Sequence, residues 1–448
     1  MESSNINPVA LLVLITLCGL VLRARRQVAV KAVLAIAAFI PLGQQLVVAG
    51  LHFTFLRILI LVGFCRMLSG ESKGFQWTTM DKLFLGWALT ALVCGMIRSP
   101  SAEVFGMFYN SVGIYFLIRC LTPDATDVVE HLQFLSLIAI FIAGVMCFEL
   151  LTHRNPFYVL GGVPQFVGER DGRFRCQGPF RHPILAGTFA ATLFPLLVGL
   201  WMQRGRQRGV VLAGIISCCI STVAAASSGA LLTCLTAGVG IGMWFMRYKM
   251  RVVRWAIIIF IAILTVSMEP PPWYIISKLS DVLGGTGWHR SYLIDQAVKY
   301  FNEWWLIGTS VTAHWAPAGE VLAVDPNNMD ITNHYVAQGI QGGALRLGLF
   351  IAMIVVSFKA VGRALRIEED GSDISKLWWA LGVGLACHCT AFISISYFDQ
   401  IEVFYFWLLA IMAELGLRNQ EALATEPSTG EAQDFSEAQA STMDSNSA

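Results

Sequence analysis

Long apolar runs separated by short polar stretches dominate the chain. A helix needs about 20 apolar residues to cross the hydrocarbon core of a bilayer. Runs close to this length occur at residues 8–22, 28–50, 53–68, 81–97, 104–121, 128–151, 183–203, 209–227, 229–246, 252–268, 335–358, 377–396 and 400–417. The pattern predicts an all-α polytopic membrane protein with about 12–13 transmembrane helices.

Basic residues follow alternate runs, and this orients the spans. They are Arg23, Arg25, Arg26, Arg66, Lys73, Lys82, Arg204, Arg206, Arg208, Arg247, Lys249, Arg251, Arg254, Lys359, Arg363 and Arg366. Because Lys and Arg collect in cytoplasmic loops, we expect the N-terminus outside and the C-terminus inside. The organisation predicted is helices over 1–151, an outer loop 152–182, helices over 183–268, a large outer segment 269–334, helices over 335–417 and a disordered cytoplasmic tail 418–448.

Composition agrees with a membrane protein. Of 448 residues, 56% are hydrophobic and only 14% charged, which is unusual for a soluble protein of this length. The net charge of +1 argues against attraction to nucleic acid. Most of the eleven cysteines fall inside apolar runs, so no disulfide framework is expected. Arg23, Arg25 and Arg26 follow the first run, which therefore reads as a retained span rather than a cleaved signal peptide.

The large outer segment is predicted to contain an amphipathic helix. Pro270, Pro271 and Pro272 end the preceding helix. Apolar residues then recur at helical spacing between positions 290 and 304, as expected for a helix lying on the membrane face. The segment also carries Trp273, Trp288, Trp304, Trp305 and Trp315. Tryptophan is common at membrane interfaces, although these rings could also stack on sugars.

The outer loop 152–182 is rich in arginine, against the usual bias. It carries Arg154, Arg170, Arg173, Arg175 and Arg181, the last of them just before the seventh run. Guanidinium groups bind phosphate oxygens in a bidentate and permanently charged way, so the loop suggests an anion site. The alternative is that these arginines bind lipid headgroups or the neighbouring Glu169 and Asp171.

Two residues of the later outer segment add to this hypothesis. Arg290 falls in the first turn of the amphipathic helix, where the helix dipole disfavours a cation unless an anion is bound. His334 begins the eleventh run, where a neutral imidazole could take a proton from an attacking hydroxyl. A histidine that is simply hydrogen-bonded at the interface is the alternative. Gly339, Gly342, Gly343 and Gly348 are expected to permit close helix packing.

Three stretches together resemble the O-antigen ligase and polysaccharide polymerase superfamily. They read GRFRCQGPFRHPILAG at 172–187, HRSYLIDQAVKYFNEWWLIGT at 289–309 and NHYVAQGIQGGALRLG at 333–348. The resemblance covers roughly residues 30–415. It implies an inverting glycosyltransferase of the bacterial inner membrane that takes a glycan from an undecaprenyl pyrophosphate carrier. The acceptor would be a hydroxyl of a glycan or lipid, and neither a metal nor another cofactor is implied.

The resemblance also implies roles for particular residues. Arg290 matches the pyrophosphate-binding arginine of the outer segment, and His334 matches the histidine that activates the acceptor. Where the family often has Ser-Arg-Gly, this chain has Ser227-Ser228-Gly229 and lacks the arginine. Arg173, Arg175 or Arg181 would then have to supply the second phosphate contact.

Two other classes of function remain open. A secondary transporter or other permease predicts ionisable residues within spans, broken helices and an internal repeat. Arg57, Glu149 and His388 are the candidates for such residues, but no convincing repeat is found. A non-catalytic scaffold would leave the arginines unexplained. Polymerase and ligase share the same chemistry, and the departure at Ser228 favours a polymerase.

Overall fold

The computed structural model is a bundle of helices and describes residues 6–40, 44–48, 51–71, 75–203, 205, 207–278, 287–317 and 327–425. The main helices are α1 (Pro8–Arg23), α2 (Arg26–Phe39), α3 (Phe55–Arg66), α4 (Thr79–Arg98), α5 (Ala102–Leu121), α6 (Ala125–Thr152), α7 (Pro183–Met202), α8 (Arg208–Ala224), α9 (Ser228–Gly242), α10 (Met250–Ser267), α12 (Gly287–Lys299), α13 (Phe301–Trp304), α14 (His334–Ile367), α15 (Asp373–Ser394) and α16 (Gln400–Thr425). Two small hairpins are formed by β1 (Gln45–Val48) with β2 (Leu51–Thr54), and by β3 (Gly168–Arg170) with β4 (Arg173–Arg175).

The all-α polytopic class predicted from the apolar runs is confirmed. Within the described ranges, eight helical segments are long and apolar enough to cross a membrane, one of them α9 and α10 taken together. Two more, α1 and α8, are apolar but shorter. The number of long spans is therefore smaller than the number of apolar runs, because several runs form helices that are too short to cross unaided.

The apolar run at residues 28–50 was predicted to form one continuous helix, and this prediction is wrong. The helix α2 ends at Phe39, and the chain then forms the antiparallel pair β1–β2 before α3 begins. Pro41 follows that helix end in the sequence, and proline cannot continue a helix because it lacks the N–H donor. At the other terminus, α16 continues through Thr425, beyond the predicted start of the tail at 418; residues 426–448 lie outside the described part.

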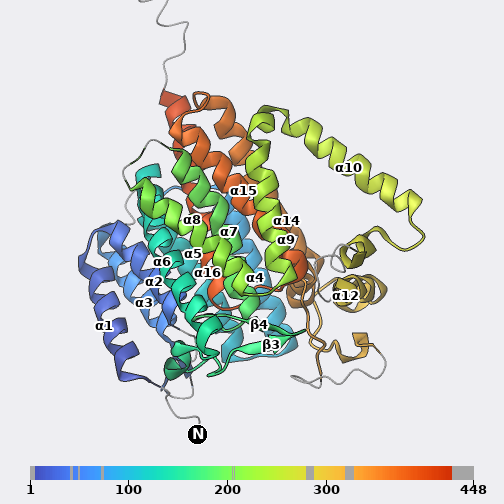
Figure 1. The fold of residues 1–448 in the computed structure, drawn as a ribbon, viewed down its shortest axis with the longest axis horizontal. Helices are drawn as coiled ribbons and strands as arrows, with labels where there is room; N and C mark the ends of the chain where they lie inside the picture. Colours follow the sequence, from blue (N-terminus) through green and yellow to red (C-terminus); the bar gives the residue numbers. More distant parts are fainter. Residues whose placement is uncertain are drawn as a thin grey trace, which may run out of the picture.

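The loops gather at two opposite ends of the bundle, as the alternating spans predict (Figure 1). At the end that holds the N-terminus, Asn7 donates a hydrogen bond to the carbonyl of Val159. At the other end, Arg26 pairs with Asp124, and Arg418 donates to the carbonyl of Pro123. The basic loops after α1, α9 and α14 all lie at this second end, which we call the basic end.

The long helix α14 is broken inside the bundle. Gly342 and Gly343 leave helical geometry, and Gly343 adopts φ 73°, a left-handed conformation that favours glycine. A Cβ on Gly343 would lie 2.3 Å from the carbonyl oxygen of Leu306. The guanidinium of Arg98 caps the helix end at this break by donating hydrogen bonds to the carbonyls of Thr309, Ile340 and Gln341. Gly343 therefore breaks the helix, while Gly339 serves the predicted close packing, here against Trp304.

Residues 287–304, predicted to contain one amphipathic helix, form the two helices α12 and α13. Leu293 and Ala297 are buried in a small separate core with Trp304 and Trp315. These two tryptophans therefore pack inside protein, unlike the interfacial layer expected for them. Trp288 and Trp305 are exposed and stay compatible with an interface.

Candidate anion-binding site

The arginine-rich loop forms a hairpin at the end of the bundle that holds the N-terminus. Strands β3 and β4 pair so that Arg170 lies opposite Arg173. The turn between them is made by Asp171 at φ 53° and Gly172 at φ 71°, a left-handed pair that suits Asp and Gly. Arg173 and Arg175 project to one face of β4 because side chains alternate along a strand.

The base of this hairpin is fastened to the bundle by a buried carboxylate. Glu149, in the last turn of α6, accepts hydrogen bonds from the backbone N–H groups of Gln177 at 2.8 Å and Gly178 at 2.9 Å. Asn155 donates to the carbonyl of Gly178, and the N–H of Cys176 donates to the carbonyl of Ala224. Glu149, considered above as an intramembrane charge of a transporter, thus holds the loop that carries the arginines.

Replacing Glu149 with glutamine is expected to loosen the loop. Glutamine keeps the shape but offers one carbonyl acceptor in place of two carboxylate oxygens, which leaves a buried N–H donor unpaired at a cost of about 1–3 kcal/mol. Trypsin should then cleave reconstituted protein after Arg173 or Arg175 faster than wild type. The matched control is Glu130→Gln on the same helix, where a partly exposed pair with Lys31 contributes little. Equal cleavage of all three proteins would contradict the clamp.

Arg290 is a buried cation that has no acidic partner among the described residues. Its side chain lies in the first turn of α12 and is 8% exposed. In the part of the chain that the structure describes, no carboxylate forms an ion pair with it. Burial, together with the positive charge of Arg170, lowers the pKa of Arg290 to about 10. The guanidinium therefore stays charged near neutral pH, and an anion would relieve both effects.

Arg175 brings further positive charge to the same place, and the neutral His182 lies within reach of that charge. His182 caps α7, its Nδ1 accepting the N–H of Ile184 at 3.2 Å. Burial, and then the charges of Arg175 and Arg170, lower the pKa of His182 to about 4. Burial and the charge of Arg170 likewise lower the pKa of Arg175. Arg170 thus acts electrostatically on Arg175, His182 and Arg290. We call the three arginines the outer cationic cluster, after the side on which the sequence predicts them.

A pH experiment tests the environment of His182. Its folded-state pKa lies below the ordinary value of about 6.5, so its contribution to stability is complete above that pH and is lost as pH falls towards 4. His182→Asn keeps a capping side chain but cannot take up a proton. Between about pH 7 and pH 4.5, the midpoint of thermal unfolding should fall further for wild type than for the variant. If the unfolding midpoints of the two proteins change with pH in parallel, the pKa of His182 is not lowered in the folded protein.

The other two predicted phosphate contacts are placed differently. Arg173 is exposed on the hairpin. Arg181 pairs with Asp399 at 3.1 Å, in the segment between α15 and α16. Burial raises the pKa of Asp399, and the charge of Arg181 opposes that rise. Arg181 therefore already has an anionic partner, and the Asp171 charge acts on Arg175, while Arg290 forms no ion pair among the described residues.

His334 belongs to a second, buried polar cluster. Its Nδ1 accepts the backbone N–H of Tyr397 at 3.0 Å, and its Nε2 lies 2.9 Å from the side-chain nitrogen of Gln338. Donation to Nδ1 requires that this nitrogen carries no proton, so the ring is neutral. Trp87 in turn donates to the Gln338 oxygen at 2.7 Å. A cavity of about 20 Å³ adjoins these groups, and Arg346 and Glu402 also line it.

The sequence interpretation missed Arg346 and Glu402. Arg346 is buried in α14 just beyond the break at Gly343, and its guanidinium lies 4.7 Å from the centre of the Trp87 ring. An ionisable residue within an apolar span is a functional candidate by default, and this signal was available in the sequence. Among the described residues, no group of three His, Cys, Asp or Glu side chains could hold a metal ion.

The geometry defines a multi-pass helical membrane protein with a cationic site at one end. Comparison with protein-family models and with curated proteins finds no match to this chain. The class of protein is therefore given by the helices and their composition.

Proposed function

We propose that this protein is a membrane glycosyltransferase that transfers or polymerises a glycan from undecaprenyl pyrophosphate onto an acceptor hydroxyl. The observation that carries the proposal is the buried Arg290, which forms no ion pair among the described residues and lies close enough to Arg170 to be affected by its charge. A buried cation is costly unless an anion accompanies it, and a pyrophosphate supplies that anion. The outer cationic cluster would then face the outside of the bacterial inner membrane, with the basic end in the cytoplasm.

The reaction needs two functions from the chain. As the bond between the anomeric carbon and the pyrophosphate oxygen breaks, negative charge grows on the leaving group, and fixed guanidinium groups stabilise that charge. The acceptor oxygen forms the new bond to the anomeric carbon from the opposite face, and its proton goes to a base. His334 can take this proton at Nε2 only in the tautomer that carries its own proton on Nδ1. Reaching that tautomer breaks the hydrogen bond from the Tyr397 N–H to Nδ1, and the acceptor hydroxyl must then replace Gln338 at Nε2.

Analysis of carrier lipids tests the proposal. A bacterial strain that lacks the protein should accumulate undecaprenyl pyrophosphate-linked oligosaccharide, and the wild-type protein should clear it. Purified protein in liposomes should release undecaprenyl pyrophosphate from the same donor as the glycan is joined. If neither accumulation nor release is observed, the proposal is wrong.

A secondary transporter is a second candidate, because α14 is broken beside buried ionisable residues. Broken helices next to Arg98, Arg346 and Glu402 are features that transporters use to build a binding site inside the bilayer. This candidate predicts uptake or export of a solute by proteoliposomes that contain no carrier lipid. Unchanged carrier lipids in the deletion strain would favour it over the glycosyltransferase.

A further inference from the structure

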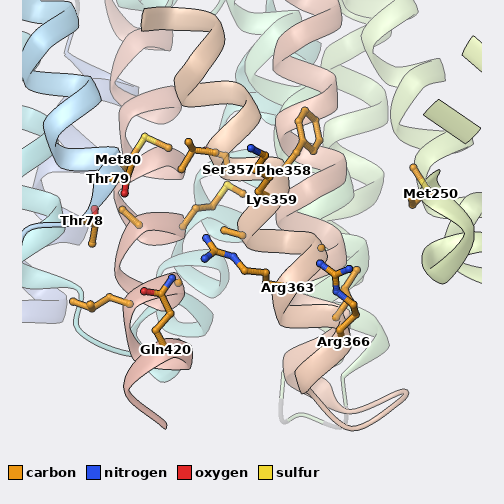
Figure 2. A pocket seen from close by; sticks show the side chains of 18 of the residues that line it. Thr78, Thr79, Met80, Met250, Ser357, Phe358, Lys359, Arg363, Arg366 and Gln420 are labelled. Atoms are coloured by element: carbon orange, nitrogen blue, oxygen red, sulfur yellow. The ribbon is translucent and has the colours of Figure 1, made fainter. Parts of the chain in front are cut away.

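A large cleft opens at the basic end, opposite the outer cationic cluster. Its volume is about 990 Å³. It lies where the start of α10, the C-terminal part of α14, the start of α4 and the end of α16 approach one another (Figure 2). Six cationic side chains line it: Arg247, Arg251, Arg254, Lys359, Arg363 and Arg366.

Among the described residues, only one of these six cations has an acidic partner. No Asp or Glu lines the cleft within the described ranges. Arg247 forms an ion pair with Asp370 and stacks on Trp244, while the other five have no ion pair in the described structure. Loop charge at a cytoplasmic face is normal, but six cations around one cleft repel one another and favour a multivalent anion.

A buried hydroxyl adds an independent observation. Ser357 lines the cleft and is 1% exposed, yet its Oγ has no hydrogen-bond partner in the described structure. A buried polar atom without a partner is costly, so a ligand oxygen or a water is expected there. In Figure 2, Ser357 lies two residues before Lys359 on α14, and Arg363 follows Lys359 by about one turn.

Apolar side chains form part of the remaining wall of the cleft. Met250, Phe358 and Met412 line it next to the cations. The helix α10, which starts at the cleft, projects away from the bundle and has no buried residue (Figure 1). Its apolar side chains, including Ile258 and Phe260, are exposed along its length. A ligand with a phosphate headgroup and acyl chains would meet both kinds of surface, whereas a soluble anion would meet only one.

We infer that this cleft binds an anionic phospholipid of the leaflet at the basic end. Its headgroup phosphate would be held by Lys359, Arg363 and Arg366, and its acyl chains would fill the space between α10 and the bundle. The site is separate from the outer cationic cluster and does not depend on the function proposed for that cluster. It would also explain what covers one side of the unpacked α10.

Native mass spectrometry of the full chain in detergent tests this inference. The probes are cardiolipin and phosphatidylglycerol, with phosphatidylcholine as the neutral lipid and inorganic phosphate as the soluble anion. Wild type should retain the two anionic lipids, and Lys359→Gln/Arg363→Gln/Arg366→Gln should bind them at least tenfold more weakly. The control Arg23→Gln/Arg25→Gln/Arg208→Gln removes equal charge at the same end, outside the cleft, and should bind as wild type does.

Each contrary result has a distinct meaning. Equal loss in the cleft and control variants would show attraction to bulk charge and overturn the site. Equal retention of phosphatidylcholine would exclude selection for the anionic headgroup. Displacement of the lipid by inorganic phosphate at similar concentration would identify a soluble anion instead. Size-exclusion profiles and thermal unfolding of the three proteins check that they are folded, so a loss of binding in folded protein is attributable to the cleft.

Discussion

Replacing Arg290 with alanine is expected to lower the rate of glycan transfer by at least about a hundredfold, the effect typical of losing one preorganised donor to a developing oxyanion. The reason is that Arg290 is buried and unpaired, so its charge is available to the leaving pyrophosphate. Because negative charge grows as the bond breaks, the loss should fall mainly on kcat rather than on KM. Release of undecaprenyl pyrophosphate in liposomes measures it.

Two further variants separate this role from folding. Arg290→Lys keeps the charge but loses the planar fork that matches phosphate oxygens, so activity should be intermediate. Lys299→Ala removes an exposed cation from the same helix, where it lies over the Tyr300 ring, and should leave transfer unchanged. Full activity of Arg290→Ala in correctly folded protein would remove Arg290 from the mechanism. An equal defect in Lys299→Ala would point to α12 as a whole.

Much of the fold follows from the apolar runs because the bilayer leaves few alternatives. Backbone polar groups have no water partner in hydrocarbon, so a long apolar run forms a helix. The grouping of basic loops at one end was predictable from a separate rule, the collection of Lys and Arg in loops on one side of the membrane. The end of α2 at Phe39 was signalled by Pro41, but the strand pair that follows was not. Short apolar segments fit a strand or a helix equally well, and only their neighbours decide.

The candidate site was predictable in its residue types and less so in its contacts. Arg175 and Arg290 are far apart in the sequence, and nothing in either motif shows that both lie near Arg170. Arg181 was grouped with them because it lies in the same loop. Its pairing with Asp399 depends on how α15 and α16 pack against each other, and no local sequence pattern predicts that packing. The place of His182 beside these arginines could not be predicted either, because capping of α7 alone accounts for a histidine at that position.

The break in α14 shows how tertiary contacts override a local pattern. Gly339, Gly342 and Gly343 all fit close helix packing, yet Gly343 terminates one helix and Arg98 caps the exposed carbonyls. Arg98 comes from α4, more than two hundred positions earlier in the chain. As a result, the irregular backbone at Gly342 and Gly343 is buried in protein rather than exposed to lipid.

The largest effect on stability is expected from Arg119→Ala. Arg119, in the last turn of α5, is 2% exposed and lies between Asp81 of α4 and Glu414 of α16, both also buried. Asp81 additionally accepts the Tyr115 hydroxyl at 2.7 Å and caps α4 through Thr78. Removing the guanidinium leaves the buried Asp81 without its cation and leaves Glu414 with only the half-exposed Arg418, which costs about 3–5 kcal/mol. Unfolding of detergent-solubilised protein by heat or denaturant should reveal it.

The matched control shares the same carboxylate. Arg418 also pairs with Glu414, at 2.9 Å, but its side chain is half exposed, so Arg418→Ala should cost less than about 1 kcal/mol. Arg119→Lys should fall between the two, because an ammonium retains the charge but cannot bridge both carboxylates in the same plane. If Arg119→Ala and Arg418→Ala unfold alike, the network does not join α4, α5 and α16 in the way argued here. Since α4 and α16 both line the cavity beside His334 and Arg346, a large loss of stability should also weaken any activity that depends on that cluster.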